Sequence, residues 1–98
     1  MKLWLDDERN APEGWKRVYS ASEAIDLIKN GGIKEISLDH DLGENKATGY
    51  LVATCIEGMA QAGLIPRIKW NVHSMNPVGR KKIEVCLKQA DKYWNLFN

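Results

Sequence analysis

Residues 36–41 read Ile-Ser-Leu-Asp-His-Asp, a short apolar run that stops abruptly at acidic residues and a histidine. A buried strand of a parallel sheet ends in this way, because its last side chains lie at the sheet edge where open α/β folds bind ligands. The same pattern occurs where Leu3-Trp4-Leu5 leads into Asp6-Asp7-Glu8-Arg9, and where Val72 leads into His73-Ser74-Met75-Asn76. The sequence therefore predicts one site built from three strand ends.

The rest of the chain alternates between predicted strands and helices. Strands are expected at Lys2 to Leu5, Trp15 to Tyr19, Ile33 to Leu38 and Ile68 to Val72. Helices are expected after the Ser20-Ala21-Ser22-Glu23 capping box, from the cap Thr48 to Gly63, and from Pro77, capped by Asn76, nearly to the end of the chain. Residues 8–14 are predicted to be a loop, so no helix separates the first two strands.

This order predicts a single α/β domain over residues 1–98. We expect a four-stranded parallel sheet that is covered by helices on both faces through right-handed crossovers. If the first strand lies between the second and the third, the ends of the strands before Asp6 and Asp39 are neighbours. The following strand then brings His73 and Ser74 to the same edge.

Charge and hydropathy exclude several classes of partner. The formal net charge of +1 argues against binding to duplex DNA or to an anionic membrane surface. No apolar run approaches the roughly 18 residues of a membrane span, and the acidic start does not resemble a signal peptide. A cytoplasmic protein is expected, either a monomer or a weak homodimer formed through the exposed edge of the second strand.

Four segments resemble the hallmark motifs of a receiver-derived family, the cyclic-phosphate-processing receiver domains. They are Leu3 to Arg9, Ser37 to Gly43, Thr48 to Tyr50, and Val72 to Arg80. The strand ends also resemble the acidic pair, phosphoacceptor aspartate, hydroxyl residue and glycine of two-component receivers, at Asp6-Asp7, Asp39, Ser74 and Gly49. The resemblance implies a small receiver-like (flavodoxin-like) three-layer fold that lacks the usual first helix and the fifth strand. It also implies activity on cyclic phosphates.

The residue types at the strand ends suit the hydrolytic opening of a cyclic phosphodiester. This reaction needs a base, an acid, and donors that stabilise charge on the phosphoryl oxygens. His40 lies between two aspartates that favour its imidazolium, which makes it the candidate acid, and His73 is then the candidate base. Asp39 and Ser74 complete the predicted catalytic set.

Phosphate binding and metal binding are expected at the same edge. The predicted phosphate ligands are Arg9, Ser74, Asn76 and Arg80, together with the free backbone donors at the start of the last helix. Asp6, Asp7 and Asp39 carry the oxygen ligands that Mg²⁺ prefers, and no other cofactor is expected. The expected substrate is a small nucleotide or an RNA terminus that carries a cyclic phosphate.

Two other interpretations of the same residues remain open. Asp39 could accept a phosphoryl group, as in signalling receivers, or the domain could bind a phosphorylated ligand or a protein partner without turnover. Simpler structural roles also exist for single residues: Asp6 and Asp7 as a turn, Ser74 and Asn76 as helix caps, and Arg80 on a solvated helix face.

Overall fold

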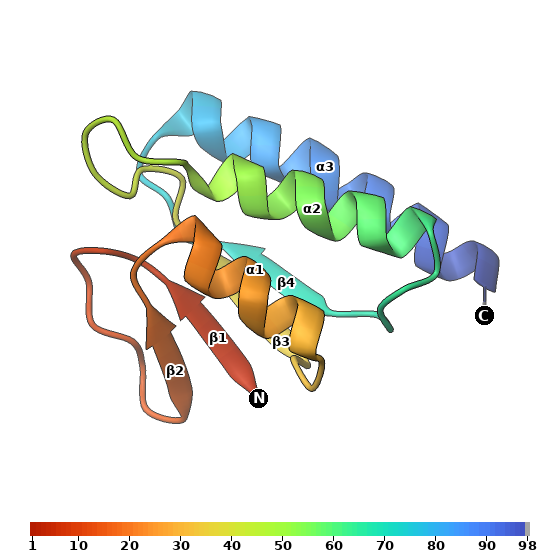
Figure 1. Cartoon of the computed structure of the whole chain (residues 1–98). Helices are drawn as coiled ribbons and strands as arrows, with labels where there is room; N and C mark the ends of the chain where they lie inside the picture. The colour runs from red at the N-terminus through yellow and green to blue at the C-terminus, as the bar shows by residue number, and fades with distance from the viewer. Residues whose placement is uncertain (98) are drawn as a thin grey trace.

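Four parallel strands form the sheet at the centre of the molecule, and three helices pack on it (Figure 1). The computed structural model describes residues 1–97. The strands are β1 (Lys2–Leu5), β2 (Trp15–Val18), β3 (Glu35–Leu38) and β4 (Lys69–Val72), and the helices are α1 (Ala21–Asn30), α2 (Gly49–Gln61) and α3 (Pro77–Phe97). The predicted α/β, receiver-like fold class is confirmed. The first predicted strand matches β1 at both ends, and the other three are longer than the observed strands by one or two residues at one end.

The strand order is β2-β1-β3-β4, so β1 lies between β2 and β3, which meets the condition for neighbouring ends before Asp6 and Asp39. The last residues of the strands are aligned, since Leu5 pairs with Val18 and Leu38, and Leu38 pairs with Val72. Parallel backbone hydrogen bonds continue one step further, from the N–H of Asp39 to Leu5 O and from the N–H of His73 to Leu38 O. This register places Asp6, Asp39 and His73 in one row along the carboxyl edge of the sheet.

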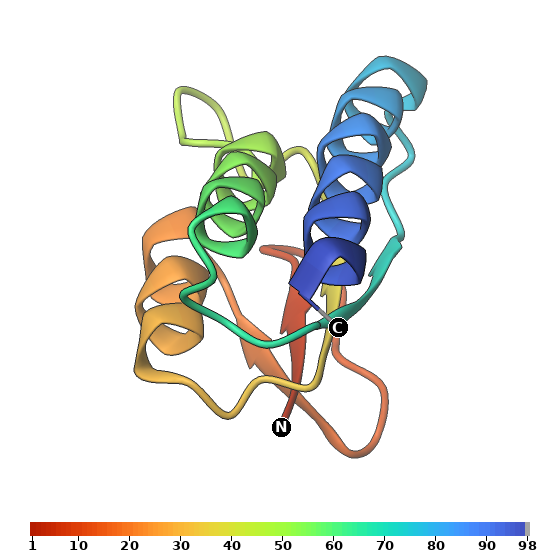
Figure 2. The ribbon, with the colours of Figure 1, turned by 90° about the vertical axis from the view of Figure 1, so that its right-hand side faces the viewer.

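The three helices lie side by side on one face of the sheet, which corrects the expectation of a three-layer domain covered on both faces (Figures 1 and 2). Helix α2 packs against both α1 and α3. The crossovers from β2 to β3 and from β3 to β4 run in the same direction along the sheet, so right-handed connections place their helices on the same side. The link between β1 and β2 has no helix that could cover the opposite face.

The two faces of the sheet differ in burial. The strand side chains that point toward the helices are buried; they include those of Leu3, Leu5, Ile36 and Leu38. They form the core together with the helix residues Val52, Ile56, Ile83 and Leu87. Residues at alternate positions point to the other side, which we call the open face, and Lys2, Lys69 and Asn71 are exposed there. Trp4 and Trp15 meet edge to face on this side, with ring centroids 5.9 Å apart.

All three helices start directly after the expected capping residues, and two of these residues make the capping hydrogen bond. Ser20 Oγ accepts a hydrogen bond from the N–H of Glu23, and Asn76 Oδ1 accepts one from the N–H of Gly79. Thr48 occupies the N-cap position of α2, but its side chain makes no capping bond. No helix within residues 1–97 is both long and apolar enough to cross a bilayer.

Candidate functional site

Three carboxylates converge at the carboxyl edge of the sheet, and we call them the carboxylate cluster. Asp6, Asp7 and Asp39 each offer an oxygen within 4.8 Å of the others. Asp6 and Asp39 follow directly after the adjacent strands β1 and β3, which explains their proximity. The side chain of Asp6 is fully buried and that of Asp39 is nearly so. The structure therefore brings together all three residues that the sequence predicted as metal ligands.

Asp6 is held as an anion by donors from the segment that follows it. Its Oδ1 accepts hydrogen bonds from the backbone N–H groups of Glu8 at 2.8 Å and Arg9 at 2.9 Å. Burial alone would raise the pKa of Asp6, but these two donors and His73 outweigh it, so the pKa lies below its usual value. Asp6 is therefore ionised at neutral pH.

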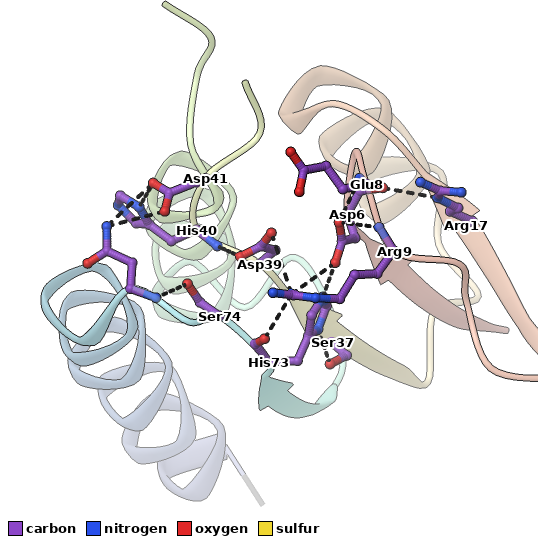
Figure 3. A network of polar contacts seen from close by, with 11 residues as sticks. Asp6, Glu8, Arg9, Arg17, Ser37, Asp39, His40, Asp41, His73 and Ser74 are labelled. Carbon is purple, nitrogen blue, oxygen red and sulfur yellow. Dashed lines mark hydrogen bonds and ion pairs between the residues drawn. The ribbon is translucent and has the colours of Figure 1, made fainter. Parts of the chain in front are cut away.

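Arg9 places its guanidinium beside two members of the cluster (Figure 3). Its Nη1 lies 3.3 Å from Asp6 Oδ2 and 3.9 Å from Asp39 Oδ2. The same nitrogen donates to the carbonyl oxygen of His73 at 3.3 Å. Because the side chain remains partly exposed, its other donors can meet a ligand from solvent.

His73 lies on the open face with both ring nitrogens engaged. Its Nε2 is 3.1 Å from Asp6 Oδ2, its Nδ1 is 2.7 Å from Ser37 Oγ, and the ring stacks on Trp4 with centroids 3.8 Å apart. Burial lowers the pKa of His73, and the nearby Asp6 offsets this only in part. A neutral ring that donates from Nε2 to Asp6 accepts at Nδ1 from the Ser37 hydroxyl. This ring has no free nitrogen for a base.

His40 lies on the side of Asp39 that faces away from Arg9, and its ring packs against the first turn of α3 (Figure 3). Its Nδ1 hydrogen-bonds to Asp41 Oδ1 at 2.9 Å, and this bond lowers the pKa of Asp41. The His40 ring packs against α3, which covers the helical face of the sheet, whereas Asp39 aligns with Asp6 and His73 at the sheet edge. The two imidazoles therefore face opposite sides of the sheet edge. This placement argues against a pair of histidines that act together on one phosphate.

The remaining predicted phosphate ligands have mainly structural contacts. Ser74 Oγ accepts a hydrogen bond from the N–H of Asn76 at 3.1 Å, and Asn76 caps α3 while its amide donates to Asp41. Arg80 is exposed and pairs with Glu84 on the same helix, with 3.5 Å between Nε and Oε1. The structure thus brings Ser74 and Asn76 to the edge beside Asp41, whereas the Arg80 ion pair is local to α3.

A cavity of about 420 Å³ opens beside the carboxylate cluster, and we call it the acidic cavity. Its lining comprises Asp7, Glu8, Arg9, Asp39, Asp41, Gly43, Glu44 and Met75, which include neither histidine. Five carboxylates against one guanidinium create a negative potential that repels a lone anion and attracts a cation. Carboxylate oxygens are also the ligands that Mg²⁺ takes, usually together with substrate phosphate. The donor set therefore fits the expected metal.

Comparison with known families settles the relationship of the chain. Residues 1–89 match the family described as Cyclic-phosphate processing Receiver domain. The chain belongs to this family. No curated protein and no solved structure gives a significant match to the chain. The family description implies a role in the processing of cyclic phosphates, and the matched segment contains every residue of the carboxylate cluster.

Sequence reasoning did not assign roles to three residues that support the site of this receiver domain. Ser37 and Trp4 hold the His73 ring, and Gly79 makes room for His40. A signal existed for the first two, because each lies two residues before an aspartate of the cluster and so shares its face of the strand. Gly79 carried no such signal, because its role depends on how α3 packs over the sheet edge.

Proposed function

We propose that this receiver domain hydrolyses cyclic phosphodiesters, with RNA 2',3'-cyclic ends or cyclic nucleotides as substrates. One observation carries the proposal: the Arg9 guanidinium lies against the carboxylate cluster at the mouth of a cavity that is open to solvent. A guanidinium binds phosphate oxygens through two parallel hydrogen bonds. The pairing of such a donor with clustered carboxylates is typical of sites that transfer phosphoryl groups with the help of a cation.

Each part of the cluster has a separate task in the proposed reaction. Asp6, Asp7 and Asp39 would hold Mg²⁺, which when bound neutralises phosphoryl charge and polarises the phosphorus centre. Arg9 binds and orients the phosphate. His73 positions Asp6 through its Nε2–H, while Ser37 and Trp4 hold the ring. In this assignment His73 is a positioning residue, because neither of its nitrogens is free to take a proton.

The reaction needs one water and one proton transfer to the departing oxygen. The water oxygen bonds to phosphorus and releases one proton to solvent. The bond from phosphorus to one ribose oxygen breaks, and that oxygen takes up one proton, so that a phosphomonoester remains. We assign these proton transfers to solvent water, because neither histidine lines the acidic cavity.

Phosphorus NMR of adenosine 2',3'-cyclic phosphate with the full chain tests this function. In the presence of Mg²⁺ we expect the cyclic phosphate signal to be replaced by a phosphomonoester signal, and a chelator should stop the reaction. Asp39→Asn should lower the rate by about a hundredfold or more, because it weakens the metal site. Asp26→Asn is the matched control, because Asp26 is an exposed aspartate on α1. No conversion by the wild-type chain in Mg²⁺ would refute the proposal.

A second function is favoured by the position of Asp39. This aspartate directly follows β3, as the phosphoacceptor follows the corresponding strand in receivers, and it has Arg9 Nη1 at 3.9 Å as a nearby cation. Incubation with acetyl phosphate followed by intact mass measurement distinguishes the two. A phosphoryl adduct that is lost in Asp39→Asn, without turnover of the cyclic nucleotide, would favour signalling. Binding of the cyclic nucleotide without product or adduct would favour a binding module.

A further inference from the structure

A second cavity, of about 400 Å³, lies between α1, the loop after β3 and the start of α2. We call it the apolar cavity, because Tyr19, Ile25, Leu42, Ala47 and Leu51 form most of its wall. Tyr19 and Leu51 are 52% and 44% exposed, so they present apolar surface directly to solvent. Ser20, Ser22 and Lys46 supply the polar groups at its wall. This combination of an apolar wall and a few polar groups is typical of sites for small organic ligands.

Consecutive residues of the loop after β3 line the apolar cavity and the acidic cavity. Leu42 lines the first and its neighbour Gly43 lines the second. A β carbon placed on Gly43 would lie 3.6 Å from Asp7 Oδ2 on one side and 3.3 Å from Cγ of Lys46 on the other. Gly43 has a φ of 112°, which favours glycine, and the absence of a side chain keeps this wall thin. Lys46, which lines the apolar cavity, and Asp7, which lines the acidic cavity, thus both lie beside Gly43.

We infer that the apolar cavity is a nucleobase subsite and that the substrate class is the nucleoside 2',3'-cyclic phosphates. This inference rests on the proposed function, because the acidic cavity must hold the cyclic phosphate. A nucleobase has flat, apolar faces, which suit the apolar wall of the cavity. Its polar edge suits the hydroxyls of Ser20 and Ser22. Arg17 covers one face of the Tyr19 ring at 4.5 Å, so in this proposal the base stacks on the opposite face.

A pair of substrates that differ only in the base tests the inference. Adenosine 2',3'-cyclic phosphate and glycerol 1,2-cyclic phosphate contain the same five-membered cyclic ester, and only the first has a base. We expect a KM about 10- to 100-fold lower for the nucleoside substrate, as base stacking on an aromatic ring provides, with a similar kcat. Tyr19→Ala and Leu51→Ala should each raise the KM for the nucleoside and leave the KM for the glycerol ester unchanged. Leu64→Ala, another exposed leucine, is the control.

The outcomes separate this inference from the proposed function. Equal KM values for both substrates in the wild type, or equal effects of Tyr19→Ala on both, would overturn the base subsite while hydrolysis still stands. If neither ester is hydrolysed, amide chemical shifts during titration with adenosine 3'-phosphate test the subsite alone. Changes at Ser20, Ile25 and Leu51 support it, and their absence overturns it. An RNA oligonucleotide with a 2',3'-cyclic end shows whether the base belongs to a free nucleotide or to an RNA terminus.

Discussion

The α carbon of Gly79 faces the His40 imidazole so closely that a β carbon built on it would lie 2.2 Å from Cγ of the ring. Real β carbons essentially never approach other atoms this closely. The first turn of α3 therefore packs directly on His40. The adjacent ring atom Nδ1 hydrogen-bonds to Asp41, which in turn accepts from the Asn76 amide. His40 is thus fixed by α3 on one side and by the loop after β3 on the other.

Gly79→Ala should destabilise the fold by about 1–3 kcal/mol, because the new methyl group overpacks the ring. Urea denaturation measures this change in the free energy of unfolding. In a His40→Ala background the cost should largely disappear. Gly58→Ala is the matched control on α2, where a β carbon meets no atom within 4 Å, and it should stabilise by about 0.5–1 kcal/mol. An equal cost of Gly79→Ala in both backgrounds would contradict the contact.

Arg9→Ala should raise the KM for a cyclic phosphate by about 10- to 100-fold, since it removes hydrogen bonds between two charged groups. Arg67 is a suitable control, because its side chain is as exposed as that of Arg9 and also pairs with an aspartate, Asp91 at 3.2 Å. Arg67→Ala should leave KM unchanged. Steady-state kinetics on adenosine 2',3'-cyclic phosphate give both values, and equal effects of the two variants would exclude Arg9 as the phosphate ligand.

Ser37→Ala should cost about 1–3 kcal/mol of stability, because it leaves the buried Nδ1 of His73 without a partner. It should also change the tautomer of His73. The Ser37 hydroxyl donates to Nδ1, so Nδ1 must be the unprotonated nitrogen and Nε2 carries the proton. Imidazole nitrogen chemical shifts report the tautomer, and urea denaturation reports the stability. Ser22→Ala, which changes an exposed serine of α1, should affect neither. An unchanged tautomer in Ser37→Ala would show that Asp6 alone orients the ring.

Stability should fall on acidification in the range where histidine titrates. The pKa of His73 is lower in the folded state than its usual value, so the unfolded chain binds the proton more readily. The contribution of His73 to the free energy of unfolding is therefore fully present above the pKa of histidine in the unfolded chain. It is lost as the pH falls from that pKa through the lower pKa of the folded state. Urea denaturation without added metal, between about pH 7 and pH 5, should show this slope in the wild type. The slope should be smaller in His73→Gln, and an identical slope would contradict a buried neutral ring.

The strand ends and the carboxylate cluster were predictable because they depend on short-range patterns. An apolar run that stops at an aspartate fixes where β1 and β3 end, and parallel pairing then aligns Asp6 with Asp39. The position of β1 between β2 and β3 was only assumed, because no short-range pattern in the sequence fixes which strands pair. The cap at Asn76 was readable from its place just before Pro77.

The layering and the roles of the histidines depended on features that local patterns do not contain. The number of layers depends on whether successive crossovers run in the same direction along the sheet. That direction is set by the order of all four strands, which short sequence patterns do not specify. His73 and His40 both follow strands, but they lie at positions of opposite parity with respect to the cluster, so only one ring shares its face. Arg80 lies one turn into α3, where Glu84 is its nearest partner.

The most direct test of the account is whether a divalent cation binds at the carboxylate cluster. A titration with substoichiometric Mn²⁺ while amide signals are recorded by NMR reports its position, because the paramagnetic ion broadens nearby signals. We predict selective broadening at Asp7, Glu8 and Asp39 to Asp41, its loss in Asp39→Asn, and its retention in Asp26→Asn. Uniform broadening, or broadening that persists in Asp39→Asn, would contradict a metal site formed by these three aspartates.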